Sequence, residues 1–209
     1  MNLNFESASL SGLSGGILPT ASAFPDWSAY YGPPSDPAHS GSLLSVFYDT
    51  VGLGGAIVAL VDSNAPSGLA PLPLQGNYSA FLEGSEPAAD TTASLGQTGT
   101  IPGTAQSLIF WGNISGSLEV SFDGQALSLV DISNAVNYTV YGVNISAFAG
   151  QTGQLLFSTP PQESDFQVDT AEIDNIQFSG SPVPEPGTVA LCALGGLALA
   201  LRWRKKSSA

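Results

Sequence analysis

No Lys or Arg occurs in the first 201 residues of this 209-residue chain, although all seventeen acidic residues lie there. This stretch therefore cannot form a salt bridge to Lys or Arg, and His39 is the only other side chain that could carry a positive charge. Each carboxylate must face water, accept hydrogen bonds from backbone or hydroxyl groups, or bind a cation. Without cations the stretch cannot neutralise phosphates either, which excludes nucleic-acid binding.

The remaining composition favours an exported, β-rich protein. Hydrophobic residues make up 43% of the chain, enough to bury a core. Only 10% of residues are charged, against roughly 25% in an average soluble domain. The single cysteine, Cys192, rules out an intramolecular disulfide and a Cys-based zinc site or nucleophile.

Residues 1–179 are predicted to form one all-β domain, an antiparallel two-sheet sandwich. Gly and Pro recur throughout, and short β-branched or aromatic runs alternate with turn residues. The clearest pair of strands spans 117–122 and 125–130, joined by Asp123-Gly124, a pair that suits a two-residue hairpin turn. The spacing of such runs is typical of a sandwich.

Further strands are expected at residues 3–8, 43–48, 56–61, 78–82, 107–111, 138–141, 154–158 and 172–178. Residues 24–37 are expected to form a long loop, and residues 145–148 a helical turn.

The C-terminus has the pattern of a membrane stop signal. An apolar stretch begins at residue 189, and the only basic residues, Arg202, Arg204, Lys205 and Lys206, follow it. Positive charge after an apolar segment stays in the cytoplasm, which places the acidic body across the membrane. We therefore expect a linker at 180–188, a transmembrane helix at 189–203 and a basic cytoplasmic tail at 204–209.

The tail also contains Pro184, Glu185 and Pro186 directly before the apolar segment. Together these three parts resemble the PEP-CTERM sorting signal of exported bacterial proteins. The resemblance implies processing by a membrane-embedded exosortase and only temporary anchoring by the helix, before release to the cell surface or extracellular matrix. An ordinary membrane anchor is the alternative. The N-terminus has no basic or apolar region that would indicate a signal peptide.

The body resembles jelly-roll domains related to galactose-binding-like and carbohydrate-binding modules. Matching stretches include residues 4–6, 24–27, 74–78, 145–151 and 174–178. The resemblance implies a structural Ca²⁺ that joins the first and last strands, held by Glu6 and Asp174 with backbone carbonyls. The acid-rich segment 163–172 is a second possible site, and solvated acids at strand ends are the plain alternative.

A glycan-binding surface would use exposed aromatic side chains. Trp27, Tyr30, Tyr31 and Trp111 are the candidates. Packing in the core is the commoner fate of a Trp, whereas Tyr30 and Tyr31, beside a Pro-rich loop, are expected to be exposed. Enzymatic catalysis finds little support, because His39 stands outside any nucleophile motif and no pair of carboxylates stands out. We therefore expect no catalytic residue.

These observations predict an exported, non-enzymatic surface or matrix protein associated with extracellular polysaccharide. A secreted carbohydrate-active enzyme and a purely structural surface protein, each with the same sorting tail, are the alternatives.

Overall fold

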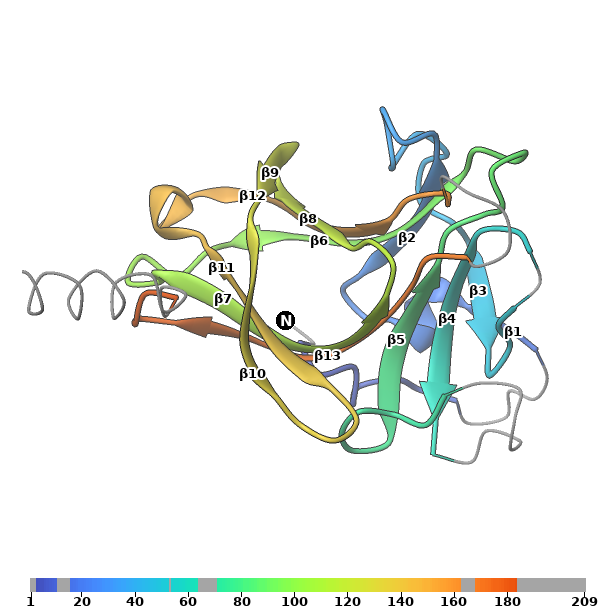
Figure 1. The fold of residues 1–209 in the computed structure, drawn as a ribbon, viewed down its shortest axis with the longest axis horizontal. Helices are drawn as coiled ribbons and strands as arrows, with labels where there is room; N and C mark the ends of the chain where they lie inside the picture. Colours follow the sequence, from blue (N-terminus) through green and yellow to red (C-terminus); the bar gives the residue numbers. More distant parts are fainter. Residues whose placement is uncertain (1–2, 11–15, 53, 64–70, 163–167, 184–209) are drawn as a thin grey trace, which may run out of the picture.

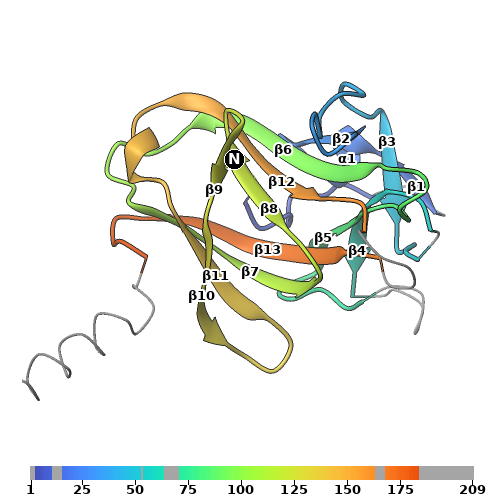
Figure 2. The same cartoon turned by 45° about the horizontal axis from the view of Figure 1, so that its top comes forward.

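Two β-sheets face each other in the computed structural model, which describes residues 3–10, 16–52, 54–63, 71–162 and 168–183 (Figure 1). The larger sheet has eight strands in the order β1-β3-β4-β5-β13-β7-β11-β10, and the smaller has five in the order β2-β6-β12-β8-β9. In Figure 2, β6, β12 and β8 lie above β7 and β13. The predicted all-β two-sheet sandwich is confirmed.

The strands of the larger sheet are β1 (Ile17–Pro19), β3 (Ser45–Tyr48), β4 (Ile57–Asp62), β5 (Tyr78–Glu83), β7 (Ser107–Ser115), β10 (Leu129–Asn134), β11 (Thr139–Asn144) and β13 (Thr170–Ser179). Those of the smaller sheet are β2 (Ser28–Gly32), β6 (Thr92–Thr100), β8 (Glu119–Phe122), β9 (Gln125–Leu127) and β12 (Thr152–Thr159). Neighbouring strands run antiparallel except β3 and β4, which are parallel.

The predicted hairpin forms as β8 and β9. Phe122 pairs with Gln125, so Asp123 and Gly124 make the turn between them. Both turn residues have positive φ, 46° and 73°, as a twist-matched two-residue hairpin turn requires. The predicted helical turn is present as the 3₁₀ helix η1 (Ser146–Phe148).

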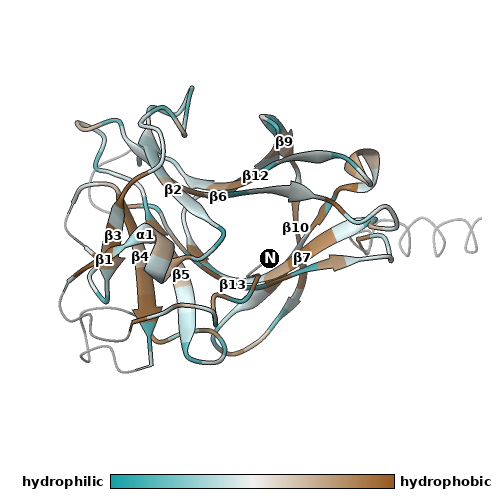
Figure 3. Cartoon of the chain, turned by 180° about the vertical axis from the view of Figure 1, so that it is seen from behind, coloured by the Kyte–Doolittle hydropathy of each residue, from teal (hydrophilic) through white to brown (hydrophobic). Residues whose placement is uncertain are grey.

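The main core lies between the two sheets and is rich in aromatic rings. Phe157 of β12 contacts Phe110 of β7 edge-to-face, with ring centroids 5.2 Å apart. A smaller apolar cluster, Ile57, Ala59, Val61 and Phe81, covers the opposite face of the larger sheet. Alternate residues of β4 thus face two different apolar environments, and β4 is strongly hydrophobic in Figure 3 while β2 is pale.

The strands depart from the predictions in several places. The predicted strand 125–130 is divided, because β9 ends at Leu127 in the smaller sheet and β10 begins at Leu129 in the larger one. β1, β2 and β6 were not predicted, and β2 lies inside the expected loop 24–37. Residues 3–8 form no strand, because Phe5 has a φ of 56°, outside the extended region. Even so, Phe5 is fully buried, and the Ile176 amide donates to the Leu3 carbonyl at 2.8 Å.

One short α-helix, α1 (Thr20–Ala23), precedes β2. Within the described ranges, no helix is long and apolar enough to cross a membrane. The predicted membrane segment 189–203 and the basic tail lie outside the described residues.

Candidate functional site

Two buried carboxyl groups lie on the outer face of the larger sheet, in β13. Ala171 and Ile173 of this strand belong to the main core, so the alternating Glu172 and Asp174 point to the opposite face. Both are almost completely buried, with 2% and 0% of their surface exposed. No Lys or Arg exists in the first 201 residues to neutralise them.

Asp174 and Glu6 both bind backbone amides of the loop that leads into β5. Asp174 accepts hydrogen bonds from the amides of Gln75 (3.0 Å) and Asn175 (2.6 Å). Glu6 accepts from the amides of Asn77 (2.8 Å) and Tyr78 (3.1 Å), and from the Asn77 side chain (3.0 Å). We call Glu6, residues 75–78 and Asp174 the acidic clip.

Gly76 allows the loop before β5 to approach the Glu6 side chain closely. It has a φ of 63°, and a Cβ at this position would lie 2.2 Å from a Glu6 carboxylate oxygen. Only glycine combines this backbone conformation with the necessary space. The clip therefore joins the start of the described chain, the loop before β5 and the last strand.

Burial perturbs the pKa values of both β13 acids. Burial raises the pKa of Glu172 to about 8, and the Ser79 hydroxyl and Leu74 amide nearby only partly offset this effect. Neither Glu172 oxygen makes a hydrogen bond of good geometry. Burial likewise raises the pKa of Asp174 to about 7, against the amides of Asn175 and Gln75, while the charge of Glu6 raises it further. Burial thus disfavours the charged form of both acids, more strongly for Glu172 than for Asp174.

Glu6 and Asp174 are also the two side chains that were predicted to hold a Ca²⁺. Glu6 and Asp174 lie close enough to interact electrostatically, yet their oxygens already accept N–H donors. Within the described part of the chain, no three His, Cys, Asp or Glu side chains cluster as a metal site. A Ca²⁺ here would need backbone carbonyls for most of its oxygen ligands. The calcium site stays a prediction.

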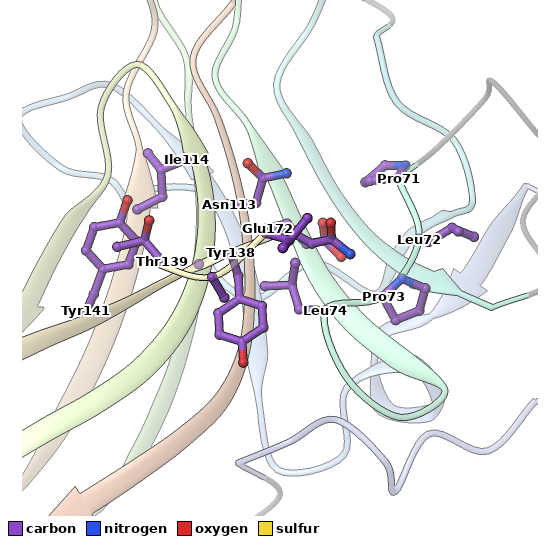
Figure 4. Close-up of a pocket in the computed structure, with 14 residues that line it drawn as sticks. Pro71, Leu72, Pro73, Leu74, Asn113, Ile114, Tyr138, Thr139, Tyr141 and Glu172 are labelled. Carbon is purple, nitrogen blue, oxygen red and sulfur yellow. The ribbon is translucent and has the colours of Figure 1, made fainter. Parts of the chain in front are cut away.

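A groove of about 560 Å³ opens beside the clip (Figure 4). Residues 71–74 and 135–138 supply its two loops, β7 and β11 contribute Asn113 and Thr139, and Glu172 lines it from β13. We call this space the Glu172 groove. Its volume lies within the roughly 300–1,000 Å³ of typical ligand pockets.

The groove combines apolar and polar surface. Among the described residues, Leu72 and Val136 are two of the four most exposed large hydrophobic side chains, at 67% and 100%. Tyr138 stacks on Trp111, with ring centroids 4.2 Å apart and planes 8° from parallel. Asn113 and Asn137 add exposed amide groups. The Pro-Leu-Pro-Leu run at residues 71–74 is a feature of the sequence that could have indicated this site.

Of the four predicted ligand-binding aromatics, Trp111 stacks on Tyr138 of the groove, and the other three occupy other places. Trp27 is only 5% exposed and packs against Phe5 and Phe157, so it belongs to the core. Tyr31 also packs against the core, and burial raises its pKa, which corrects the expectation that it is exposed. Tyr30 is half-buried on the smaller sheet, where its hydroxyl accepts a hydrogen bond from Gln154 at 3.0 Å. The structure does not bring the three together as one surface.

His39 lies in an exposed turn, with Nδ1 3.1 Å from an Asp36 carboxylate oxygen. This pair is far more exposed than a catalytic acid–base pair usually is.

The predicted sorting motif, Pro184, Glu185 and Pro186, and the basic residues after it lie outside the described residues. Comparison with known families matches residues 182–205 to the PEP-CTERM protein-sorting motif. The chain therefore carries a PEP-CTERM sorting signal, which implies processing by an exosortase and sorting to the cell surface. No curated protein matches the chain.

Several solved structures resemble the sandwich. TmCBM61, solved with β-1,4-galactotriose, shares 15% identity at a TM-score of 0.42, over 85% of this chain and 94% of its own. The Stig cyclase Fisc from Fischerella sp. TAU shares 13% sequence identity at a TM-score of 0.42, and the match covers 87% of this chain and 98% of the cyclase. The family 11 carbohydrate-binding module from Clostridium thermocellum shares 14% sequence identity at a TM-score of 0.35, and the match covers 80% of this chain and 96% of the module. Similarities of this size assign neither ligand nor activity.

Proposed function

We propose that this chain is an exported, non-enzymatic protein of the cell surface or extracellular matrix, whose body associates with extracellular polysaccharide after an exosortase processes its tail. The sorting motif at residues 182–205 is the observation that carries this proposal. Pro184 and Pro186 would keep the triplet out of a helix, which would leave its backbone open to a processing enzyme. The apolar stretch from residue 189 would hold this site at the membrane.

The charge distribution supports release of the body. All four basic residues lie C-terminal to the Pro-Glu-Pro triplet, so processing at the triplet would leave a strongly acidic body without Lys or Arg. Such a body repels anionic lipid and nucleic-acid surfaces. Neutral polysaccharide, which the sandwich can bind through amides, hydroxyls and aromatic rings, is compatible with this charge.

The groove chemistry favours binding over hydrolysis. Glycoside hydrolysis uses a pair of carboxylates across the scissile bond. Among the described residues that line the Glu172 groove, Glu172 alone has a carboxylate side chain. A single buried acid can orient or repel a ligand, but it lacks the second acid that this reaction requires.

The test expresses the full chain in a bacterium that carries an exosortase. Replacing Pro184, Glu185 and Pro186 together by Ala should leave the protein full-length and membrane-bound, while the unchanged chain loses its tail. A matched control replaces Gly180 and Ser181 by Ala, outside the matched residues 182–205, and should be processed normally. Intact mass distinguishes the two forms. Unchanged processing of the triplet variant would overturn the sorting part of the proposal.

The polysaccharide part has its own test. The processed protein should be retained by polysaccharide extracted from the producing cells and should release no reducing sugar from it. Release of reducing sugar that is abolished by Glu172→Gln would instead establish an enzyme. Absence of retention would leave a purely structural surface protein.

A further inference from the structure

Two of the four most exposed large hydrophobic side chains of the described surface line the Glu172 groove. Leu72 and Val136 are 64 positions apart in the chain, but both belong to the loops that line this one space. Exposed apolar groups gathered around a hollow indicate a binding site, because a monomer gains nothing from leaving them in water. Scattered single apolar residues would not carry this inference.

The polar groups of the groove indicate what kind of ligand fits. Asn113 and Asn137 each offer both donors and acceptors of hydrogen bonds. A sugar ring presents hydroxyl groups at its edge and C–H groups on its faces, so it needs neutral hydrogen-bonding partners beside apolar ones. An apolar peptide or a lipid chain would leave these amides without partners, at a cost of about 1–3 kcal/mol each.

The stacked pair Trp111 and Tyr138 provides a rigid element at the groove. The planes of the two rings lie within 8° of parallel, so Tyr138 is supported by the larger indole ring. A supported aromatic ring loses little conformational freedom on binding, and such rings form favourable contact surfaces for ligands with apolar faces. Tyr138 is one of the groove residues shown in Figure 4.

Charge narrows the ligand class further. Glu172 is the one carboxylate among the described lining residues, and the first 201 residues contain no Lys or Arg that could bind a carboxylate or sulfate group. An anionic sugar would therefore enter a groove that has an acid on its wall and no fixed cation. Its carboxylate would lose water without gaining a charged partner, and the acidic body, which has seventeen acids and no Lys or Arg in its first 201 residues, would repel it.

We propose that the Glu172 groove binds a neutral polysaccharide chain and discriminates against uronic-acid polymers. A sugar ring packs against Leu72, Val136 and Tyr138, and its hydroxyls bond to Asn113 and Asn137. This inference rests on the polysaccharide association proposed above, and it names the site and the ligand class. It places the site on the outer face of the larger sheet, away from Tyr30 on the smaller sheet.

Affinity electrophoresis of the full chain in detergent at pH 8 tests the site, with a neutral galactan, a neutral glucan and polygalacturonate as probes. Val136→Asp and Leu72→Asp place a charge on the groove loops and should weaken retention by a neutral polymer about tenfold or more. Leu44→Asp and Ile17→Asp are matched controls, because their side chains are 92% and 63% exposed and do not line the groove. They should behave like the unchanged chain.

Unfolding midpoints of all four variants should stay close to that of the unchanged chain, since all four side chains are exposed. Tyr138→Phe should retain binding, whereas Tyr138→Ala should reduce it, because the ring and not the hydroxyl makes the contact.

The outcomes separate this inference from the proposed function. If a neutral polymer retains the groove variants as well as the controls, the groove is not the site, but polysaccharide association stands. Loss of retention in Tyr30→Ala alone would move the site to the smaller sheet.

Stronger retention by polygalacturonate would overturn the ligand class. No retention by these probes or by polysaccharide of the producing cells would remove the proposed association itself. Self-association that only the groove variants abolish would make the groove a contact between copies and overturn the inference.

Discussion

The backbone amide of Gln75 donates to the Asp174 carboxylate at 3.0 Å, across 99 positions of sequence. This bond connects the loop before β5 to the strand that ends the described sandwich. It also fixes the loop that continues from Leu74, a residue of the Glu172 groove. The acidic clip and the groove are therefore neighbours that share one loop.

Asp174→Ala should destabilise the protein by about 1–2 kcal/mol, because the amides of Gln75 and Asn175 lose their acceptor. Urea unfolding measures the difference. Asp131→Ala, which removes an exposed acid of β10, should change stability by no more than about 0.5 kcal/mol. Equal effects of the two substitutions would show that the bonds to the loop contribute nothing.

Stability should fall as pH rises from about 4.5 to about 8. Burial raises the pKa of Glu172 to about 8 from an ordinary value of 4.5, so the folded protein holds a proton that the unfolded chain has released. The stability that this bound proton contributes is fully present below the pKa of Glu172 in the unfolded chain, and it is lost as pH rises through the pKa of Glu172 in the folded protein. Asp174, whose pKa is raised to about 7, acts in the same direction.

Urea midpoints at several pH values measure this dependence, and Glu172→Gln should make the profile flatter. Glu119→Gln, at an exposed position of β8, is the control and should leave the profile unchanged. A midpoint that rises between pH 5 and pH 8 would contradict the assignment.

Millimolar Ca²⁺ should raise the melting temperature at pH 8, and a chelator should reverse the effect. A cation beside Glu6 and Asp174 would offset the mutual repulsion that helps to raise the pKa of Asp174. Mg²⁺ at the same concentration should act more weakly, because it requires stricter octahedral geometry. If chelator and Ca²⁺ give the same melting temperature, the loop amides alone satisfy the two carboxylates.

Gly124→Ala should lower the free energy of unfolding by about 1 kcal/mol, because of the backbone conformation alone. A Cβ at Gly124 would meet no atom within 4 Å, but the residue has a φ of 73°. Gly103 has equal space and no positive φ, so Gly103→Ala is the matched control and should be neutral or slightly stabilising. Equal unfolding midpoints for the two variants would refute the turn assignment.

Strands with branched or aromatic side chains could be predicted from sequence, and β6 shows why others could not. Its sequence, Thr-Ala-Ser-Leu-Gly-Gln-Thr-Gly-Thr, has few large apolar residues and no clear alternation. Six of its nine residues are nevertheless buried, because β2 and β12 cover its two edges and the core covers one face. Tertiary pairing, and not local preference, makes this segment a strand.

The candidate site divides in a similar way. The proximity of Glu6 and Asp174 was expected from a family resemblance and is present in the acidic clip. The Glu172 groove was not expected, because its walls come from parts of the chain that only the sheet order brings together. These parts are residues 71–74, 112–114, 135–139 and 172. Trp27 illustrates the opposite case, since an aromatic residue that suits a binding surface also suits a core.

The position of β13 has a mechanical consequence. This strand lies between β5 and β7, with hydrogen-bonded ladders on both sides, and only residues 180–183 separate it from the sorting triplet. Tension transmitted through the tail would enter the sandwich along this interior strand and load both ladders in shear. Many hydrogen bonds would then have to break together, so the anchored body should resist drag better than it would if the tail followed an edge strand such as β10.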